Sequence, residues 1–546
     1  MHRSFCIAAC DLAARPKRAG DTILRRFLCR LVPLTLAACA TLPGERSVTP
    51  SHALTDTAET TLGRHAERIL AGLQGPTGVR MLSRGQDAFL ARLVLAEKAE
   101  RSLDAQYYIW HGDDTGRLLI AAFLRAADRG VRVRVLIDDV GSAANDTNLL
   151  LLDRHSNVEV RLFNPLASRS ARSLGMIFDF ARTNRRMHNK SFTADNQITI
   201  VGGRNIGDEY FEARSDVDFT DLDALTVGAA VAGVSILFDR YWNSPVTYAI
   251  TELTTANPGA EAYAEARASL EEFERAQEGQ AYALALRDSG LAQQLRGGTI
   301  SFTAAEVRVM ADDPAKVERP DEDRTKNLVP QLLPEFAGLR EQLMLVSPYF
   351  VPGDKVVESL RRLRERGVRV RVLTNSLAST DEIAVYAGYA KYQRALLEAG
   401  IELYEISPAA VREGTARQRH KRDDDDPHGS GRSRAALHAK VLIFDCRTFF
   451  VGSMNLDPRS AFTNTEIGLM IDAPAEAAQL CATLERALPQ GAYRLELRTT
   501  EPGEAQIEWV RIEDGREVHY ASEPMASAWQ RFKRWFYSLL PIEPLL

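Results

Sequence analysis

Apolar positions along the chain switch between helical and strand spacing in a regular order. Apolar residues recur every three to four positions in residues 61–73, 88–99 and 116–129, which predicts three helices. Residues 102–110 read as a strand, and residues 131–138 alternate apolar and polar positions as a half-buried strand does. Strand, helix and strand in this order form a β-α-β unit, and such units build parallel sheets. The pattern therefore predicts an α/β fold.

The same unit occurs a second time. Residues 129–136 and residues 366–373 are both Arg-Gly-Val-Arg-Val-Arg-Val-Leu. The segments around them also correspond: 106–110 with 346–350, and 158–165 with 401–408. We therefore expect an internal duplication, with two α/β/α sandwich halves related by a pseudo-twofold axis and the active site between them.

The repeat sets the expected domain organisation. We expect a first half at 61–258, a helical linker at 259–300, a second half at 301–490 and a C-terminal extension at 491–546. The extension predicts a β-hairpin from Tyr493 to Tyr520 that turns at Asp514-Gly515, followed by an amphipathic helix. Trp529 and Trp535 lie on that helix among basic residues, a pattern that suits either an interfacial helix or a helix that closes the core.

Composition narrows the classes of protein. A chain of 546 residues is too long for one core, and 45% hydrophobic with 26% charged residues is typical of globular proteins. The formal charge of −5 disfavours a general nucleic-acid binder, which needs a basic face. Outside the first forty residues only Cys446 and Cys481 remain. Two cysteines make no disulfide framework, and both lie in or beside apolar runs, so we expect structural burial.

The N-terminal region is typical of a secretory leader rather than of a fold. A basic segment and a short apolar run end at Leu-Ala-Ala-Cys, which resembles a bacterial lipobox with Cys39 as the lipidated residue. We expect a signal peptide at 1–38 and a polar tether at 39–60. The alternatives are an unlipidated signal anchor and a buried helix. A lipidated Cys39 would anchor the protein on the periplasmic side of the bacterial envelope. Ala40 after the cysteine favours the outer membrane, by resemblance to sorted lipoproteins.

Two matching motifs carry the candidate chemistry. Each reads His-x-Lys-x4-Asp, and together they supply the candidate catalytic residues His188, Lys190, Asp195, His438, Lys440 and Asp445. In an extended strand, residues two apart point to the same face, so each His projects with its Lys. Two such strands facing each other surround one point with two imidazoles and two ammonium groups. The alternative is a pair of surface strands without a shared site, which the duplication disfavours.

A phosphate diester suits that arrangement. The lysines would neutralise phosphoryl oxygens, one His would attack phosphorus, and the other would protonate the departing alcohol. Asn205 and Asn455 follow the two motifs at equivalent places and are candidate neutral phosphate donors. This chemistry needs no metal and no cofactor. Four successive aspartates at 423–426 lie in a charged, Gly-rich loop at 417–433, and they lack the alternating spacing of a calcium loop.

The two motifs resemble those of the phospholipase D superfamily. Three further segments (138–141, 202–211 and 455–460) resemble the C-type branch of the bacterial cardiolipin synthases, and the similarity covers roughly residues 65–546. The resemblance implies a transferase with a phosphatidyl-histidine intermediate, which the hydroxyl of phosphatidylglycerol resolves. Phospholipids, namely phosphatidylglycerol and also phosphatidylethanolamine, are the implied partners, together with a membrane surface. A phospholipase D that releases phosphatidic acid is the alternative, and a phosphodiester nuclease is a weaker one.

The resemblance also assigns supporting roles. An acid about thirty residues after each His backs the imidazole, which points to Asp221 and Glu466. Asp195 and Asp445 would support the motifs structurally. Where the family has Gly-Ser, the first half has Gly203-Arg204, and Arg204 would either grip a second phosphate or form an internal ion pair. Arg459 is a second candidate for a lipid phosphate, because its planar fork suits that group.

Overall fold

The computed structural model describes residues 42–44, 49–141, 146–169, 172, 176, 179–213, 217–318, 324–409, 434–501, 504–513 and 515–546. Residues 46–165 and 185–546 form one compact body, and residues 1–45 with 166–184 form a separate unit that contains the short helix α7 (Phe180–Thr183). Predictions for the signal peptide, Cys39 and the charged loop 417–433 lie outside the described residues. The fold described below is that of the body.

The first half is built on one mixed sheet. Its strands, in spatial order, are β1 (Thr77–Leu82), β8 (Asp223–Gly228), β6 (Ile198–Gly202), β5 (Ser191–Ala194), β2 (Ser102–Tyr107), β3 (Arg132–Asp138), β4 (Val158–Phe163) and β9 (Thr247–Ala249). Strands β2, β3 and β4 run parallel, as the β-α-β pattern predicts, and the other neighbours pair antiparallel.

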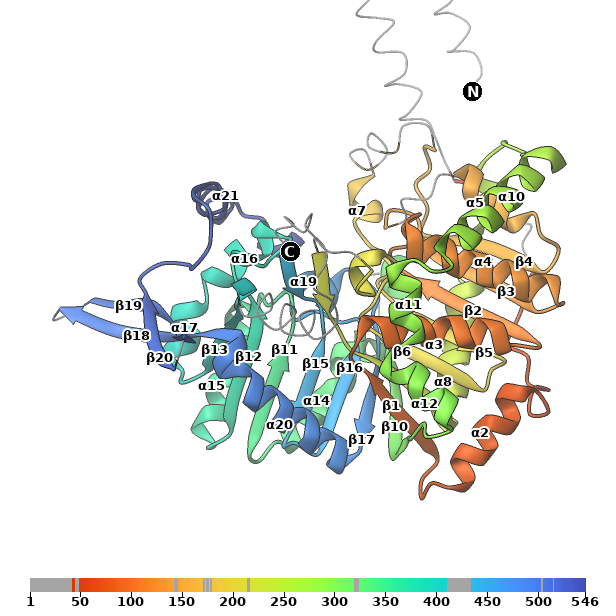
Figure 1. Ribbon diagram of the computed structural model, residues 1–546. Helices are drawn as coiled ribbons and strands as arrows, with labels where there is room; N and C mark the ends of the chain where they lie inside the picture. Colours follow the sequence, from red (N-terminus) through yellow and green to blue (C-terminus); the bar gives the residue numbers. More distant parts are fainter. Residues whose placement is uncertain are drawn as a thin grey trace, which may run out of the picture. The chain divides into compact units, whose positions relative to one another are not determined.

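The second half repeats this order strand for strand. Its strands are β10 (Thr303–Ala311), β17 (Ile467–Asp472), β16 (Thr448–Gly452), β15 (Val441–Phe444), β11 (Gln342–Val346), β12 (Arg369–Asn375), β13 (Glu402–Ile406) and β18 (Ala492–Glu501). Strands β1 and β10 pair antiparallel and join the two sheets edge to edge. Figure 1 shows the first half in red to yellow-green and the second in green to blue. The predicted duplicated α/β fold is confirmed.

Alternating positions on a central strand serve two different cores. On β3, Val133, Val135 and Ile137 contact helices on the outer face of the sheet, whereas Leu136 packs on the inner face. Arg134 also points inward, where its guanidinium makes two hydrogen bonds with Asp104, at 2.7 and 2.8 Å. Pairing this buried cation removes the large cost of an isolated charge.

Helices cover the outer faces and fill the space between the sheets. The outer helices are α2 (Thr61–Ala71), α3 (Gly85–Lys98), α4 (Asp114–Asp128), α5 (Asp146–Asp153) and α9 (Ile250–Leu253) in the first half, and α14 (Leu328–Gly338), α15 (Gly353–Glu365), α16 (Ile383–Ala390) and α17 (Gln393–Glu398) in the second. Helices α8 (Ala229–Trp242) and α20 (Pro474–Gly491) share the inner core with residues of both sheets. Short turns complete the body: η2 (Asp208–Tyr210), α13 (Ala315–Glu318), η3 (Arg324–Lys326) and α19 (Pro458–Phe462).

The residues between the halves are helical, as the sequence predicts. They form α10 (Ala260–Gln277), α11 (Ala281–Arg287) and α12 (Gly290–Gly297). The predicted tether, in contrast, is too long. Residues from 49 onward lie along the body, where the Ser51 carbonyl accepts a hydrogen bond from Arg134 and the Thr49 carbonyl accepts one from Arg161. Buried arginines need acceptors, and the backbone of this extended segment provides them.

Cys481 is buried, as expected, but the sequence analysis did not predict that the two cysteines are bonded to each other. Cys446, in the turn between β15 and β16, forms a disulfide with Cys481 of α20. The two residues are 35 positions apart in the sequence, and their Cα atoms are 5.9 Å apart. The spacing of the two cysteines in the sequence does not predict the disulfide. Packing in the inner core, rather than local sequence, positions the helix that carries Cys481.

The C-terminal extension differs from the predicted hairpin. Three strands, β18, β19 (Glu504–Glu513) and β20 (Arg516–Tyr520), form an antiparallel meander, and β18 also pairs with β13 of the main sheet. Gly515 of the predicted turn therefore lies between β19 and β20 rather than at the centre of one long hairpin, and Asp514 lies outside the described residues. Helix α21 (Ala528–Ser538) follows and packs against α16 (Figure 1), and the short turn η4 (Glu543–Leu545) ends the described chain. Within the described residues, no helix is long and apolar enough to cross a bilayer.

Candidate active site

Each catalytic motif runs beside a strand from the other half. The segment before His438, β14 (Arg434–Leu437), pairs in parallel with β7 (Val217–Thr220), so the His438 amide donates to the Thr220 carbonyl at 2.8 Å. The equivalent contact on the other side joins the His188 amide to the Thr465 carbonyl at 2.9 Å. The residues after Thr220 and Thr465 are the two candidate acids. Backbone pairing between halves therefore sets each acid beside a His of the opposite half.

The acid–imidazole pairs are accordingly crossed. The Nδ1 atom of His188 lies 2.9 and 3.1 Å from the two carboxylate oxygens of Glu466, and Nδ1 of His438 lies 2.6 Å from Asp221 Oδ2. Counting along the sequence places each acid after the His of its own half, so the crossing emerges only from the fold. A carboxylate at Nδ1 fixes the imidazole tautomer and leaves Nε2 as the reactive nitrogen.

Serine hydroxyls hold one of these acids more firmly than the other. Glu466 accepts hydrogen bonds from Ser453 Oγ at 2.5 Å and Ser460 Oγ at 2.8 Å, in addition to its contact with His188. Asp221 accepts a hydrogen bond from the backbone amide of Leu222 at 2.7 Å. Burial raises the pKa of each acid, but the facing imidazole and nearby lysine more than offset it, so both pKa values lie below the ordinary range.

Burial dominates the titration of the two imidazoles. Both side chains lie in the interior between the halves, and burial lowers the pKa of His188 to about 4 and that of His438 to about 3. The lysines of the motifs act in the same direction, and the carboxylates act against it. Both imidazoles are therefore neutral at pH 7, which is the state a nucleophile requires.

The two lysines stand beside the imidazoles as the motif spacing predicts. Lys190 Nζ donates to the carbonyl of His188 at 2.6 Å, and Lys440 Nζ donates to the carbonyl of His438 at 2.5 Å. Burial lowers the pKa of Lys190 well below its ordinary value and that of Lys440 to about 8, while Asp221 and Glu466 oppose the shift. Both buried ammonium groups act electrostatically on the two imidazoles, so the region favours an anion.

The two imidazoles line one cavity of about 440 Å³. Tyrosine rings contact both imidazoles edge-on: Tyr108 lies 5.1 Å from His188 and Tyr210 lies 5.0 Å from His438, between ring centroids. The sequence analysis missed these tyrosines and the Tyr349–Asp381 pair at the wall, in which the phenol donates to the carboxylate at 2.8 Å. Tyr108 and Tyr349 lie just past β2 and β11, which is the signal that could have found them.

The aspartates of the motifs lie away from the cavity and hold the strand ends. Asp195 accepts hydrogen bonds from the backbone amides of residues 100–102, and Asp445 accepts them from the amides of residues 340–342. Both aspartates have positive φ, at 51° and 50°. This geometry fits the structural role that the resemblance implies for them.

The two asparagines differ in how their amides are used. Asn205 Oδ1 accepts from the Ile109 amide at 3.2 Å, and its Nδ2 donates to the Tyr210 hydroxyl at 3.0 Å. Asn455 also lines the cavity, but its buried Oδ1 has no hydrogen-bond partner among the described residues. Asn455 is therefore the better placed of the two for a ligand contact.

The prediction that Arg204 binds a phosphate is not supported, because its guanidinium is fully used inside the first half. It donates to the carbonyls of Leu82, Ser83, Tyr210 and Asp221, at 2.7–3.1 Å, and lies 3.5 Å from Asp223 Oδ2. The internal ion pair is thus the alternative that the structure shows. Arg459, in contrast, lines the cavity beside Asn455.

No metal site is apparent among the described ranges. They contain no group of three His, Cys, Asp or Glu side chains that could hold an ion. The aspartates at 423–426 lie outside those ranges.

The pKa of Lys440 predicts an alkaline limit to activity. As pH rises through about 8, Lys440 loses its proton and its attraction for a phosphate, so kcat/KM is expected to fall about tenfold per pH unit above that value. The measurement is a pH profile of kcat/KM for the wild type and for Lys440→Arg, whose guanidinium stays charged. If kcat/KM of Lys440→Arg still falls above the same pH as that of the wild type, a group other than Lys440 causes the fall.

Comparison with known sequences also finds two related halves, and its matches cover most of the chain. The family described as "Cardiolipin synthase, PLD-like domain" matches residues 93–242 and 334–488, one match in each half. The chain is 40% identical to cardiolipin synthase C of Escherichia coli over 474 residues, which are 86% of this chain and 97% of that protein. It is 29% identical to an uncharacterized protein of Helicobacter pylori, over 84% of this chain and 88% of the relative.

A solved structure supports the fold. The crystal structure of phosphatidylserine synthase from Haemophilus influenzae covers 88% of this chain with a TM-score of 0.52, at 14% sequence identity. At that identity the likeness concerns the fold alone.

Proposed function

Because the chain belongs to the phospholipase D-like family of cardiolipin synthases, we propose that it transfers a phosphatidyl group between phospholipids and forms cardiolipin. The observation that carries this proposal is the pair of crossed acid–imidazole contacts at one cavity. Two imidazoles, each backed by a carboxylate, beside two lysines suit in-line exchange at a phosphodiester, with one imidazole as nucleophile and the other as proton donor. The enzyme is of the phospholipase D type.

The reaction proceeds in two balanced steps. In the first, His188 Nε2 attacks phosphorus, the bond from phosphorus to the headgroup oxygen breaks, and His438 gives that oxygen a proton. In the second, His438 takes the proton of an incoming hydroxyl, the new phosphorus–oxygen bond forms, and the phosphorus–nitrogen bond breaks. His438 therefore begins the first step protonated and regains its proton in the second.

The buried lysines and carboxylates explain how His438 can be protonated at the start of the reaction. Burial is the main cause of the low imidazole pKa values, and the charges of Lys190 and Lys440 lower them further; a bound phosphate anion opposes the contribution of the lysines. Asp221 then faces a protonated His438 across 2.6 Å and stabilises it. Phosphate binding thus favours the protonation state in which His438 can act as an acid.

The acceptor separates a synthase from a hydrolase. Bulk water can resolve the intermediate to phosphatidic acid unless an acceptor lipid is held next to phosphorus, and good positioning is worth effective molarities of roughly 10⁵ M and above. Arg459 in the cavity wall is our candidate for holding the phosphate of the acceptor lipid. Of the two arginines that the sequence suggested for this role, Arg459 is the one that lines the cavity.

Mass analysis of lipid products tests the proposal. Purified protein would be incubated with phosphatidylglycerol alone and together with phosphatidylethanolamine, and cardiolipin and phosphatidic acid would both be quantified. We expect cardiolipin from the wild type, and from Arg459→Ala a larger loss of cardiolipin than of phosphatidic acid. Arg447→Ala, at an exposed turn, is the matched control. Phosphatidic acid as the sole product of the wild type would instead identify a hydrolase.

Helix α21 supports an association with the membrane surface. Its large apolar side chains Trp529, Phe532, Trp535 and Phe536 are 47–61% exposed. Its basic side chains are partly exposed: Arg534 lies 3.3 Å from the carboxylate of the buried Glu523, and Lys533 lies over the exposed Trp529 ring. A helix that exposes a cluster of aromatic rings with cations beside them is unfavourable in water and suits the boundary of a bilayer.

Vesicle binding tests the role of α21. In a Cys39→Ser background, replacement of Trp529, Phe532 and Trp535 by alanine is expected to weaken binding to phosphatidylglycerol vesicles at least about 100-fold, since each buried aromatic contributes about 1.5–3 kcal/mol. Cosedimentation measures the partition. Alanine at Phe180 and Ile236, two exposed apolar residues elsewhere, is the control. Equal binding of both variants would rule out α21 as the docking element.

We also propose that the protein is lipid-anchored at Cys39 on the periplasmic side. The Cys446–Cys481 disulfide supports this location, because disulfides persist in oxidising compartments such as the periplasm. In the α21 variant, the additional change Cys39→Ser is expected to release the protein from membranes, whereas the same variant with Cys39 intact is expected to stay bound. An unprocessed N-terminus on the native protein would contradict it.

A further inference from the structure

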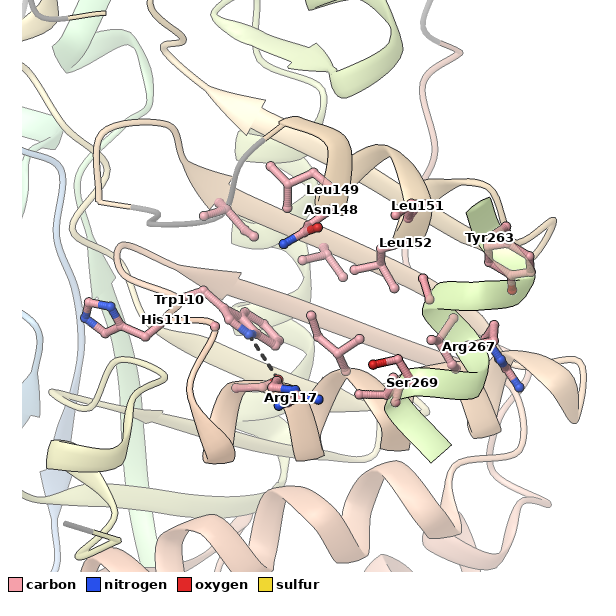
Figure 2. A pocket seen from close by; sticks show the side chains of 18 residues that line it. Trp110, His111, Arg117, Asn148, Leu149, Leu151, Leu152, Tyr263, Arg267 and Ser269 are labelled. Carbon is pink, nitrogen blue, oxygen red and sulfur yellow. Dashed lines mark hydrogen bonds between the residues drawn. The ribbon is translucent and has the colours of Figure 1, made fainter. Parts of the chain in front are cut away.

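A second cavity, of about 460 Å³, lies on the outer face of the first sheet. Figure 2 shows its walls: α4 on one side, α5 on another, and the linker helix α10 across them. Most of the wall is apolar and consists of Trp110, Ile120, Leu124, Val135, Ile137, Leu149, Leu151, Leu152 and Leu270. A half-open cleft with such walls would expose apolar surface to water in the absence of a ligand.

This cleft shares a wall with the active-site cavity. Tyr108 and Ile109 line the active site, and the next two residues, Trp110 and His111, line the cleft. Ser191, at the start of β5, pairs with Gln106 near the end of β2, so the catalytic His188 lies at the same edge of the sheet. The cleft therefore begins within a few residues of the reacting centre.

The linker helix α10 leaves the cleft open because some of its side chains that line the cleft are small. Two of the five α10 residues that line the cleft, Ala266 and Ser269, are small, and no side chain of α10 is fully buried. Larger apolar residues at these two positions would fill the space. In Figure 2 the labelled residues run from His111 at one end to Tyr263 and Arg267 at the other, so the cleft is elongated.

The two arginines of the cleft are engaged with the protein. The Arg117 guanidinium lies 3.7 Å from the ring centroid of Phe273, and Arg267 pairs with Asp128 at 2.7 Å. An anionic ligand would have to compete with these contacts. The apolar wall is therefore the feature that selects the occupant, and it recognises hydrocarbon without directional bonds.

We propose that this cleft binds one acyl chain of the phospholipid whose phosphate lies between His188 and His438. The inference rests on the proposed function and adds a second binding site to it. Along α4 the lining residues run from Gly116 to Leu124, eight residues, or about 12 Å at the rise of an α-helix. An extended chain fits such a cleft, and its other end reaches the shared wall at Trp110.

The proposal predicts a dependence on chain length that a single residue controls. With short-chain phosphatidylglycerols from hexanoyl to decanoyl, the wild-type KM for phosphodiester cleavage is expected to fall up to about fourfold per methylene. Ala266→Trp, which fills the cleft, is expected to flatten this dependence. Ala268→Trp, on the exposed side of the same helix, is the matched control and is expected to behave as the wild type.

Photo-crosslinking provides a measurement that does not need turnover. Phosphatidylglycerol with a diazirine in the middle of one acyl chain is expected to label peptides of α4, α5 and α10 in the wild type, and Ala266→Trp is expected to lose that label. Labelling confined to other elements, or a wild-type KM without chain-length dependence, would overturn the acyl-chain site. If the wild type cleaves no phospholipid while the label still maps to the cleft, the proposed function fails and the cleft remains a lipid site.

Discussion

Replacement of His188 by asparagine is expected to lower kcat by at least about 10⁴-fold and to abolish the covalent intermediate. Asparagine keeps a polar group of similar size but cannot attack phosphorus. Replacement of His438 by asparagine is expected to lower turnover of phosphatidylglycerol by a similar factor, because the departing alkoxide then lacks its proton donor. On natural substrates the two variants therefore look alike.

A substrate with a good leaving group separates the two roles. A p-nitrophenyl phosphodiester needs no proton donor in the first step, so His438→Asn is expected to release one burst of nitrophenol per enzyme and to accumulate phospho-histidine. His188→Asn is expected to show no burst. Acid-labile label mapped to His188 would complete the assignment. A burst in His188→Asn with label on His438 would reverse it, and no label on either residue would be fatal to the covalent mechanism.

Removal of one carboxylate is expected to damage the imidazole of the opposite half. Asp221→Asn and Glu466→Gln are each expected to lower kcat about 10²- to 10⁴-fold, because the amide cannot stabilise the imidazolium and can favour the wrong tautomer. Asp221→Asn acts on His438, 2.6 Å away, and Glu466→Gln acts on His188, 2.9 Å away. The p-nitrophenyl burst distinguishes them, since Asp221→Asn retains it and Glu466→Gln slows it.

Double-mutant cycles give the sharper test of the crossing. Glu466→Gln is expected to add little to the loss caused by His188→Asn, whereas it adds its full effect to His438→Asn. The mirror-image result is expected for Asp221→Asn. Ser453→Ala, which removes one donor from Glu466 but leaves the carboxylate, is the control and is expected to cost much less. Coupling within each half rather than across would refute the observed pairing as the catalytic one.

Sequence patterns predicted the duplicated fold and the two motifs because those features are local or repeated. A β-strand reveals itself by alternation, as at residues 131–138, and a repeat by identity, as at residues 129–136 and 366–373. The pairing of Asp221 with His438 is not local, since 217 residues separate the two, and the repeat alone does not show whether an acid faces the His of its own half or of the other. It depends on β7 lying beside β14, which no periodicity in either segment encodes.

Arg204 and Cys481 show a second limit of the sequence. An arginine next to a catalytic motif looks the same in sequence whether it faces a ligand or a ring of carbonyls, and only the fold shows that Arg204 faces the carbonyls. The Cys446–Cys481 disulfide is equally hidden, because α20 brings the thiols together through inner-core packing. In both cases tertiary contacts determine the role of the side chain, and the neighbouring sequence does not predict that role.

The crossed pairs also govern when this chain can become active. A half that folds first presents an imidazole whose carboxylate is still on the unfolded half, and it holds only one of the two lysines. One half alone therefore lacks part of the proposed catalytic set. The set is complete only where β7 lies beside β14 and Met187 pairs with Thr465.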